Sequence, residues 1–467
     1  MGGGTPNRTK DPGRTPVQPR GACTAIAMLA LVAGARTLAA QPLATPPLAA
    51  WVELGPTGPI VRAITEAAAC PRASAVESTT ATPAAWGTPM TVRAEPDLPF
   101  FPNRVCEWQA PPEARFIALE GHPVVLRMPV PNPQRIVIFG DSGCWGGEDQ
   151  NCLHGWPFPR ISRYAAARNP DLVIHLGDYN YRGTNCDAYD SCCTYNPISC
   201  GFPNCGDAWA NWQVDFFTPA APLLAAAPWV VVRGNHELCA RGGYGWFRYL
   251  DPHSPPPTCA ANPVDELTFT APYPLYLGDA LRLIVFDAAD ACGQPGLRDT
   301  TATYREQFER VAAYAAESAP PQTWLVTHKP VWGIQRYSPQ ETTVLNYTLQ
   351  QASNNRLPPQ ISLILAGHEH LFQSLTMNEG DGPPTLLIGT GGAELDDPTI
   401  VPPLVQNLTV PPNGPTIAAA LTAHDHGYML MERAATSWTA TFYDRFDQPL
   451  ATCTSTARPS ICKTVAP

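Results

Sequence analysis

The sequence has little charge and no excess of basic residues. Charged residues make up 15% of the 467 residues, and 40 acidic side chains outnumber 30 lysines and arginines, which gives a net charge of −10. A chain with this balance lacks the basic surface of a nucleic-acid-binding protein, so we expect no nucleic acid among its partners. Hydrophobic residues, at 44%, still suffice for a large core, which excludes a disordered chain.

Long apolar runs are also missing, with one exception near the N-terminus. Residues 22–35 are largely apolar and follow four basic residues, and small residues at 37–40 offer a cleavage site for signal peptidase. The run is shorter than the roughly 20 residues of a spanning helix, so we interpret residues 1–40 as a cleaved signal peptide rather than a membrane anchor. The sequence therefore predicts an exported protein, secreted or periplasmic, without a membrane span after cleavage.

Cysteine is abundant, but no pair has the Cys-x-x-Cys spacing of a structural zinc site. Cys23 leaves with the signal peptide, so 15 − 1 = 14 cysteines remain, an even number that suits a fully paired, oxidised set. Seven lie in a loop insertion at 143–205, and Cys239 would make eight. Spacing does not fix connectivity, but the outlying pairs that we expect are Cys70 with Cys106, Cys259 with Cys292, and Cys453 with Cys462.

The apolar pattern changes along the chain. Short strand-like runs separated by Gly and Pro predict a small N-terminal β-sandwich. After a Pro-Asn-Pro hinge at 131–133, longer continuous runs predict strands covered on both faces in an α/β domain, with helices at 161–168 and 303–317. We expect a Pro/Ala linker, the sandwich domain, the α/β domain and a C-terminal tail at residues 41–50, 51–130, 134–450 and 451–467.

Five of the later apolar runs end in short polar motifs. These are Gly-Asp-Ser-Gly (140–143), Gly-Asp-Tyr-Asn-Tyr (177–181), Gly-Asn-His-Glu (234–237), Thr-His-Lys-Pro (327–330) and Gly-His-Glu-His (367–370). Since ligands bind at the carboxyl ends of strands in open α/β sheets, we expect these side chains to share one crevice. Oxygen and imidazole donors without thiolate favour Fe, Mn or Zn, and seven donors are too many for one ion. The motifs therefore predict a pair of ions that activates water and clamps a phosphoryl group.

The five motifs, in this order, resemble those of the calcineurin-like metallophosphoesterases, and the tyrosine that ends the second motif is similar to the purple acid phosphatase branch. The resemblance spans residues 135–392 and implies a four-layer α/β/β/α sandwich. It implies one ion bound by Asp141, Asp178, Tyr181 and His370, and a second bound by Asp178, Asn235, His328 and His368. Asp178 would bridge the two, and a tyrosinate favours iron in the first position, with Fe, Mn or Zn in the second.

The resemblance also implies an activity. A metal-bound hydroxide would attack the phosphorus of a phosphomonoester, as in acid phosphatases, while His236 binds phosphate or protonates the leaving oxygen. The chain departs from the branch at Leu325, where valine is usual, and after the fourth motif, where no further histidine follows. A phosphodiesterase or nucleotidase on the same metal core, or an inactive surface-binding protein, are the alternatives. The sequence does not indicate the oligomeric state.

Other candidate residues have competing interpretations. Arg182 and Arg241 could hold phosphate with a planar guanidinium group, although for either one alone a solvated or salt-bridged arginine is the more usual outcome. His175 lies inside a predicted strand, so we expect a core histidine. In His424-Asp425-His426, the alternation of side chains along a strand would place both imidazoles on the same face of that strand. We expect this segment to be a surface strand and not a part of the site.

Overall fold

The structure is a computed structural model. It describes residues 45–465 except 146–149, 151, 153, 182–205, 255, 260–268, 294–298, 319, 321, 339–340, 397–406, 411–412, 436 and 456–458. The predicted signal peptide at 1–40, most of the cysteine-rich insertion and Arg182 lie outside the described residues. No helix in the described ranges has the length and apolar character needed to cross a membrane.

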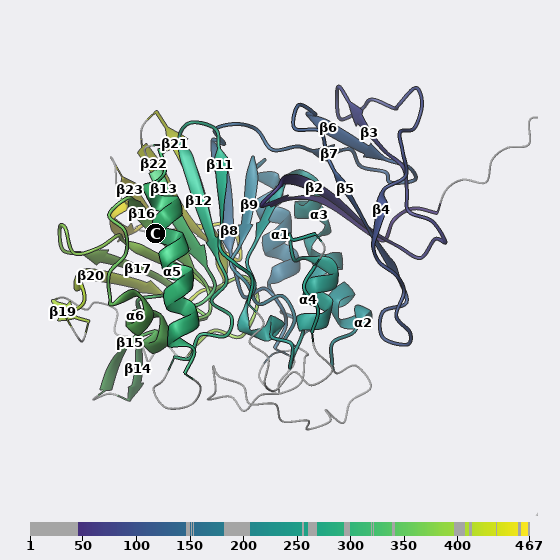
Figure 1. Ribbon diagram of the computed structural model, residues 1–467. Coiled ribbons are helices and arrows are strands. Elements are labelled where there is room, and N and C mark those ends of the chain that lie inside the picture. The colour runs from purple at the N-terminus through teal and green to yellow at the C-terminus, as the bar shows by residue number, and fades with distance from the viewer. Residues whose placement is uncertain are drawn as a thin grey trace, which may run out of the picture. The chain divides into compact units, whose positions relative to one another are not determined.

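Two large sheets form the centre of the fold (Figure 1). The first has eleven strands in the order β24 (Pro459–Thr464), β23 (Pro449–Ser455), β22 (Ser437–Asp444), β21 (Gly427–Ala434), β8 (Arg135–Phe139), β9 (Leu172–His175), β10 (Trp229–Val231), β1 (Ala49–Gly55), β2 (Gly58–Thr65), β5 (Arg104–Gln109) and β4 (Thr91–Ala94). The second has eight in the order β11 (Tyr273–Leu277), β12 (Leu281–Phe286), β13 (Gln322–Thr327), β16 (Ile361–Ala366), β18 (Thr385–Ile388), β17 (Phe372–Met377), β20 (Thr416–Ala423) and β19 (Leu408–Thr409). A hairpin of β14 (Gly333–Ser338) and β15 (Glu341–Leu345) is separate.

Helices cover the outer faces of both sheets (Figure 1). The first sheet is covered by α1 (Phe158–Ala167) and α3 (Thr218–Ala226), and the second by α5 (Thr301–Ala316) and α6 (Tyr347–Ser353). The short helices α2 (Trp209–Trp212) and α4 (Gly243–Tyr249) lie near α3. The buried face of α5 carries Phe308 and Val311 at helical spacing, and the Phe308 ring packs 4.9 Å from that of Phe286 on β12. Both predicted helices are therefore present, each beginning two or three residues earlier than expected.

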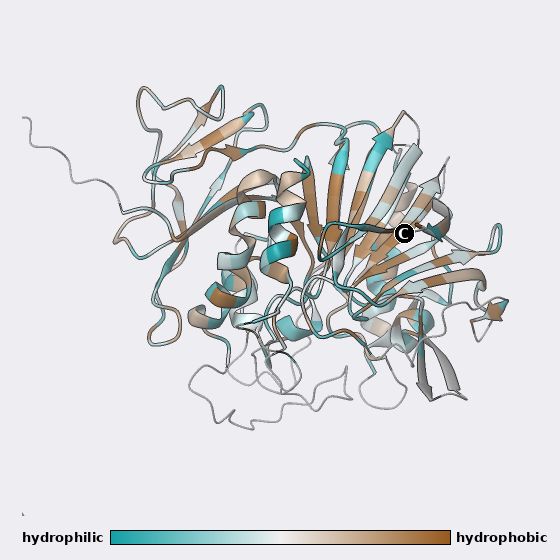
Figure 2. Ribbon diagram, turned by 180° about the vertical axis from the view of Figure 1, so that it is seen from behind, coloured by the Kyte–Doolittle hydropathy of each residue, from teal (hydrophilic) through white to brown (hydrophobic). Residues whose placement is uncertain are grey.

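The space between the sheets is filled by aromatic and aliphatic side chains. Phe372 on β17 stacks on Phe442 of β22 with ring centroids 4.6 Å apart, and Trp324 on β13 meets Trp438 of β22 at 5.2 Å. Figure 2 shows the resulting brown, apolar strands between the helical layers. The strands read as continuous apolar runs because each is buried on both faces. The expected four-layer α/β/β/α sandwich is confirmed.

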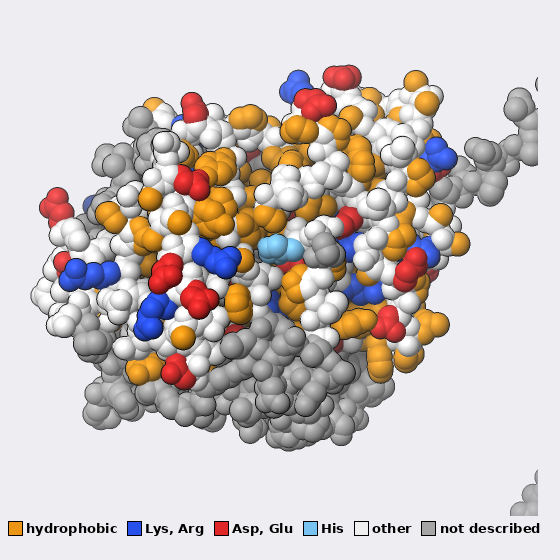
Figure 3. All heavy atoms as spheres, viewed as in Figure 1, with side chains coloured by type: hydrophobic (Ala, Val, Ile, Leu, Met, Phe, Trp, Pro, Cys, Tyr) orange, Lys and Arg blue, Asp and Glu red, His pale blue; other side chains and the backbone are white. Residues whose placement is uncertain are grey.

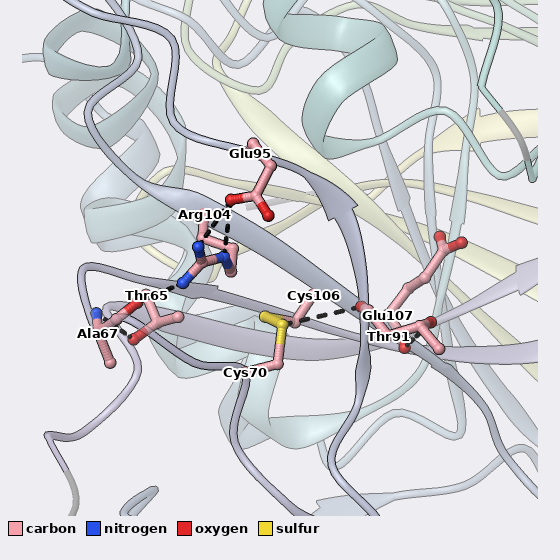
Figure 4. Close-up of a disulfide and its surroundings, with 8 residues drawn as sticks. All are labelled: Thr65, Ala67, Cys70, Thr91, Glu95, Arg104, Cys106 and Glu107. Atoms are coloured by element: carbon pink, nitrogen blue, oxygen red, sulfur yellow. Dashed lines mark hydrogen bonds and ion pairs between the residues drawn. A yellow bond between two sulfur atoms is a disulfide. The ribbon is translucent and has the colours of Figure 1, made fainter.

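The N-terminal region is β-rich, as predicted. Strands β1, β2 and β5 pack against a three-stranded sheet of β3 (Ala73–Val76), β6 (Phe116–Leu119) and β7 (Leu126–Arg127) around buried residues such as Val52, Val61 and Ile117. A disulfide joins Cys70 to Cys106 on β5, as expected (Figure 4).

The N-terminal strands also extend the first large sheet. Strand β1 pairs in parallel with β10, with Glu53 opposite Trp229. Trp51 and Leu54 of β1 belong to the main core, whereas Ala50 and Val52 face the small one. The predicted sandwich therefore shares a sheet with the α/β domain. The pairing of β1 with β10 depends on tertiary packing, so the local pattern of apolar residues does not indicate it.

Three sequence expectations need correction. The expected C-terminal tail at 451–467 contains regular structure, because β23 and β24 complete the edge of the first sheet and are joined by the expected Cys453–Cys462 disulfide. Strand β1 begins at Ala49, inside the expected linker. Cys259 pairs with Cys239 and not with Cys292, because α4 and the following turn bring the two cysteines together.

Candidate metal centre

The five motifs lie at one edge of the two sheets. Strands β8, β9 and β10 are parallel neighbours whose ends are in register, with Phe139 opposite His175 and His175 opposite Val231. The residues that follow these ends are Asp141, Asp178 and Asn235. In the second sheet β13 and β16 are also parallel neighbours, and they end just before His328 and His368.

One group of side chains meets around the phenol oxygen of Tyr181. Its Oη lies 3.1 Å from Asp141 Oδ1, 3.2 Å from Asp178 Oδ2 and 2.9 Å from His370 Nε2. His370 Nε2 is itself 3.5 Å from Asp141 Oδ1. Four side chains from three motifs, far apart in sequence, thus direct their donor atoms to one point.

A second group meets around the imidazole of His328. Its Nε2 lies 2.9 Å from Asn235 Oδ1 and 3.2 Å from Asp178 Oδ2. Ligand atoms of Asp178, His328 and His368 all lie within 4.8 Å of one another. Asp178 Oδ2 therefore takes part in both groups, and the division matches the two ligand sets that the sequence resemblance implies.

Hydrogen bonds to the backbone orient two of the imidazoles. Nδ1 of His328 donates to the carbonyl oxygen of Leu176 (2.7 Å), and Nδ1 of His370 donates to that of Glu394 (2.6 Å). A carbonyl can only accept, so these bonds place a hydrogen on Nδ1 and direct Nε2 of each ring to the site. Metal-binding histidines use this arrangement, because it fixes the tautomer and the ring orientation.

The turns at the site adopt uncommon backbone conformations. Asp141, Asp178 and His368 have φ of 58°, 59° and 75°, in the left-handed region that non-glycine residues rarely adopt. The buried carboxylate of Glu237 supports the second turn by accepting from the backbone N–H groups of Asp178 (3.0 Å) and Tyr179 (2.8 Å). Strained residues of this kind cluster at functional sites. Sequence reasoning missed Glu237, although it stands within the third motif.

The charges of the site balance in pairs. Burial opposes ionisation of Asp178, but the positive charge of His328 outweighs it and holds the Asp178 pKa well below its usual range. Burial also lowers the pKa of His328, yet Asp178 raises it to about 9, and Asp141 likewise raises the pKa of His370 to about 10 against burial. Burial, together with the nearby carboxylates, raises the pKa of the Tyr181 phenol well above its usual value. Each imidazolium thus compensates a carboxylate, a role that a bound cation would take over.

The side chains fit a pair of metal ions. Two carboxylates, an amide oxygen, a phenol and three imidazoles converge, and this set of oxygen and nitrogen donors suits Fe, Mn or Zn.

The other predicted site residues lie beside the two groups. The ring of His236 is 4.1 Å from that of Tyr181, and its backbone N–H donates to Asp178 Oδ1 (2.9 Å). Burial, and next the positive charge of Arg241, lowers the pKa of His236 well below its usual value. Arg241 lies in the turn that follows His236, where the backbone N–H of Gly242 donates to the carbonyl oxygen of His236 (2.9 Å). His175 is a core histidine, as predicted: it is fully buried and its Nε2 lies 2.8 Å from Ser142 Oγ.

The expectation for His424-Asp425-His426 was wrong. These residues connect β20 to β21, and His426 is buried, not part of a surface strand. His426 lines a cavity of about 340 Å³ with Trp156 and Glu394. Because the carbonyl of Glu394 also holds His370, this cavity adjoins the site. His424 is partly buried, so neither imidazole lies on a fully exposed surface.

Comparisons with known proteins bear on the family and the fold. The family model described as calcineurin-like phosphoesterase matches residues 134–372. No curated protein matches the sequence significantly. The structure is similar to a purple acid phosphatase, PPD1, from yellow lupin (Lupinus luteus) seeds, with a TM-score of 0.52 and 14% identity over 86% of this chain and 73% of that chain. It is also similar to PhoD, with a TM-score of 0.54 and 11% identity over 91% of this chain and 94% of that chain. At these identities the two similarities show a shared fold.

Proposed function

The chain belongs to the calcineurin-like phosphoesterases, whose model matches more than half of it, and from this premise we propose that it is an exported phosphomonoesterase with a dinuclear metal centre. Members of this family are metal-dependent phosphoester hydrolases, so the reaction class follows from membership. The substrate, the two ions and the compartment are our proposals.

The observation that carries the proposal is the position of Asp178. Its Oδ2 lies 3.2 Å from Tyr181 Oη in one group of donors and 3.2 Å from His328 Nε2 in the other. We assign Asp141, Asp178, Tyr181 and His370 to one ion and Asp178, Asn235, His328 and His368 to the second. When bound, such a pair supplies an activated water and holds phosphate oxygens.

The side chains beside the centre serve the substrate in this proposal. We assign His236 to the phosphate rather than to an ion, because only its backbone N–H contacts Asp178 while its ring packs on Tyr181. There it binds a phosphate oxygen or protonates the leaving oxygen. Arg241, in the turn that follows His236, adds positive charge for the phosphate, and Arg182 keeps the same role as a prediction from sequence.

The phenol of Tyr181 bears on the identity of the ions. A tyrosinate is a hard anionic ligand, so we propose iron in the site that contains Tyr181 and Fe, Mn or Zn in the other. Tyr181 is buried and its pKa is raised by burial and by two carboxylates. Of the candidate ions, a trivalent cation would stabilise the tyrosinate most strongly here.

The disulfides support export. Four join cysteines of the described residues, at Cys70–Cys106, Cys144–Cys152, Cys239–Cys259 and Cys453–Cys462. Disulfides persist in oxidising compartments, which agrees with the signal peptide predicted at 1–40.

On the face seen in Figure 3, acidic and basic side chains are interspersed among the described residues.

A phosphodiesterase is the second candidate. The cavity of about 340 Å³ at His426 adjoins His370 and has room for a second esterified group.

Two chromogenic substrates separate these functions. We expect the purified protein to hydrolyse p-nitrophenyl phosphate, to lose this activity with a chelator and to regain it with added metal. Faster hydrolysis of bis(p-nitrophenyl) phosphate would identify a diesterase instead. Turnover of neither substrate by protein that holds two ions would contradict both and favour a binding protein. Asp178→Asn serves as the inactive control.

A further inference from the structure

An exposed tryptophan borders the proposed metal centre. The side chain of Trp145 is 39% exposed, although tryptophan is highly buried on average. Its ring centroid lies 5.4 Å from that of Tyr181, 5.9 Å from that of His236 and 6.3 Å from that of His370. A large apolar ring is therefore held partly in solvent beside the residues that we assign to the ions and the phosphate.

The backbone that carries Trp145 is fixed in place. The neighbouring Cys144 forms a disulfide with Cys152. The backbone N–H of Trp145 donates to Oε1 of Gln150 (2.7 Å), and Nε2 of Gln150 donates to the carbonyl of Gly392 (2.7 Å). Gly392 lies in the turn that also contains Glu394, whose carbonyl orients His370. The turn at 392–394 therefore holds both Trp145, through Gln150, and His370, one of the proposed ligands.

The orientation of the indole leaves it suited to stacking. The planes of Tyr181, His236 and His370 make angles of 49°, 63° and 77° with the Trp145 ring, so none of the three stacks on it in parallel. Indole rings gain most from flat conjugated partners, and stacking of a base on an aromatic side chain strengthens binding measurably.

We propose that Trp145 is a stacking surface for the organic group of the substrate, and that the preferred substrates are phosphate esters of flat aromatic groups. This inference rests on the proposed function, because the phosphate must lie at the metal centre for its ester group to reach the indole. Aryl and nucleoside phosphates share the required chemistry, and the experiment distinguishes them.

The test compares substrate preference, not activity alone. We would measure kcat/KM for phenyl phosphate, adenosine 5′-phosphate and ethyl phosphate in the wild type, Trp145→Ala and Trp145→Phe. The ratio of the aromatic to the ethyl ester should fall about tenfold in Trp145→Ala, as expected for the loss of one stacking contact, and much less in Trp145→Phe. A fall confined to one aromatic ester identifies that ester as the preferred class. Trp86→Ala is the matched control, because Trp86 is half-buried between β3 and β4.

A merely structural role for Trp145 gives a different result. If the indole only packs against Tyr181 and His236 and holds them in position, Trp145→Ala lowers kcat/KM equally for all three esters. The ratios of the aromatic esters to the ethyl ester are then unchanged, and that result overturns the proposal. A second measurement does not need turnover: calorimetry should show that metal-loaded wild type prefers phenylphosphonate to methylphosphonate and that Trp145→Ala has lost this preference. Equal preference in both proteins also overturns the proposal. A wild type that hydrolyses no ester refutes the proposed function, and the phosphonates then decide on Trp145 alone.

Discussion

Gly234 leaves no room for a side chain at the proposed bridge. Its φ of −95° and ψ of 174° are accessible to alanine, so backbone strain is not the obstacle. A Cβ at this position would lie 2.0 Å from Oδ1 and 2.3 Å from the backbone nitrogen of Asp178, and 2.7 Å from Oε2 of Glu237. Contacts this short do not persist, so the turn that carries Asp178 must move. Because Asp178 is shared by both groups of donors, its displacement should weaken both ion sites.

We therefore expect Gly234→Ala to lower the free energy of unfolding by about 3 kcal/mol, at the upper end of the cost of overpacking, and to leave fewer than two ions bound. Urea unfolding and metal analysis measure the two effects. Gly382→Ala is the matched control, because its Cβ would meet its nearest neighbour, the Trp332 ring, at 3.4 Å, an ordinary contact. That variant should differ from wild type by less than about 1 kcal/mol. Equal unfolding midpoints for both variants, with two ions bound to each, would refute the reasoning.

Three further predictions concern single side chains. In iron-loaded protein, Tyr181→Phe should abolish the visible absorption of a phenolate-to-iron bond, and a band that persists would exclude Tyr181 as a ligand. His236→Ala should keep both ions and lower kcat by about 10²-fold or more, most for esters with poor leaving groups; an unchanged kcat would remove its role as an acid. Burial lowers the pKa of His253, but the carboxylate of Asp251, 2.9 Å away, outweighs burial and raises it above 6.5. The stability that this imidazolium contributes is complete below pH 6.5 and is lost as the pH rises through the raised pKa. His253→Gln should remove that part of the pH dependence of unfolding, and superimposable pH curves for wild type and variant would contradict it.

The strands that position the site were predictable because each is a continuous buried run. The apolar runs at 135–139, 281–286 and 385–388, which predict strands, coincide with β8, β12 and β18. The motifs at the strand ends were also readable, since in four of the five a glycine followed by a polar residue comes shortly after the strand ends. The convergence of the motifs is a property of register: parallel pairing aligns the ends of β8, β9 and β10.

What the sequence did not reveal depends on contacts between distant segments. Nothing local indicates that β1 pairs with β10, or that Cys239 meets Cys259 across α4. Trp145 has no sequence signal at all, because its importance comes from rings contributed by other motifs. Glu237 could have been noticed as an acid next to His236, but its hydrogen bonds to the second motif require the fold.

Metal stoichiometry tests the central claim most directly. Protein purified from an oxidising compartment and analysed for metal should contain two ions per chain, and Asp178→Asn, prepared in the same way and shown to be folded, should contain neither. A wild type that binds only one ion at saturating metal, or an Asp178→Asn variant that retains two, would contradict a dinuclear centre bridged by this aspartate.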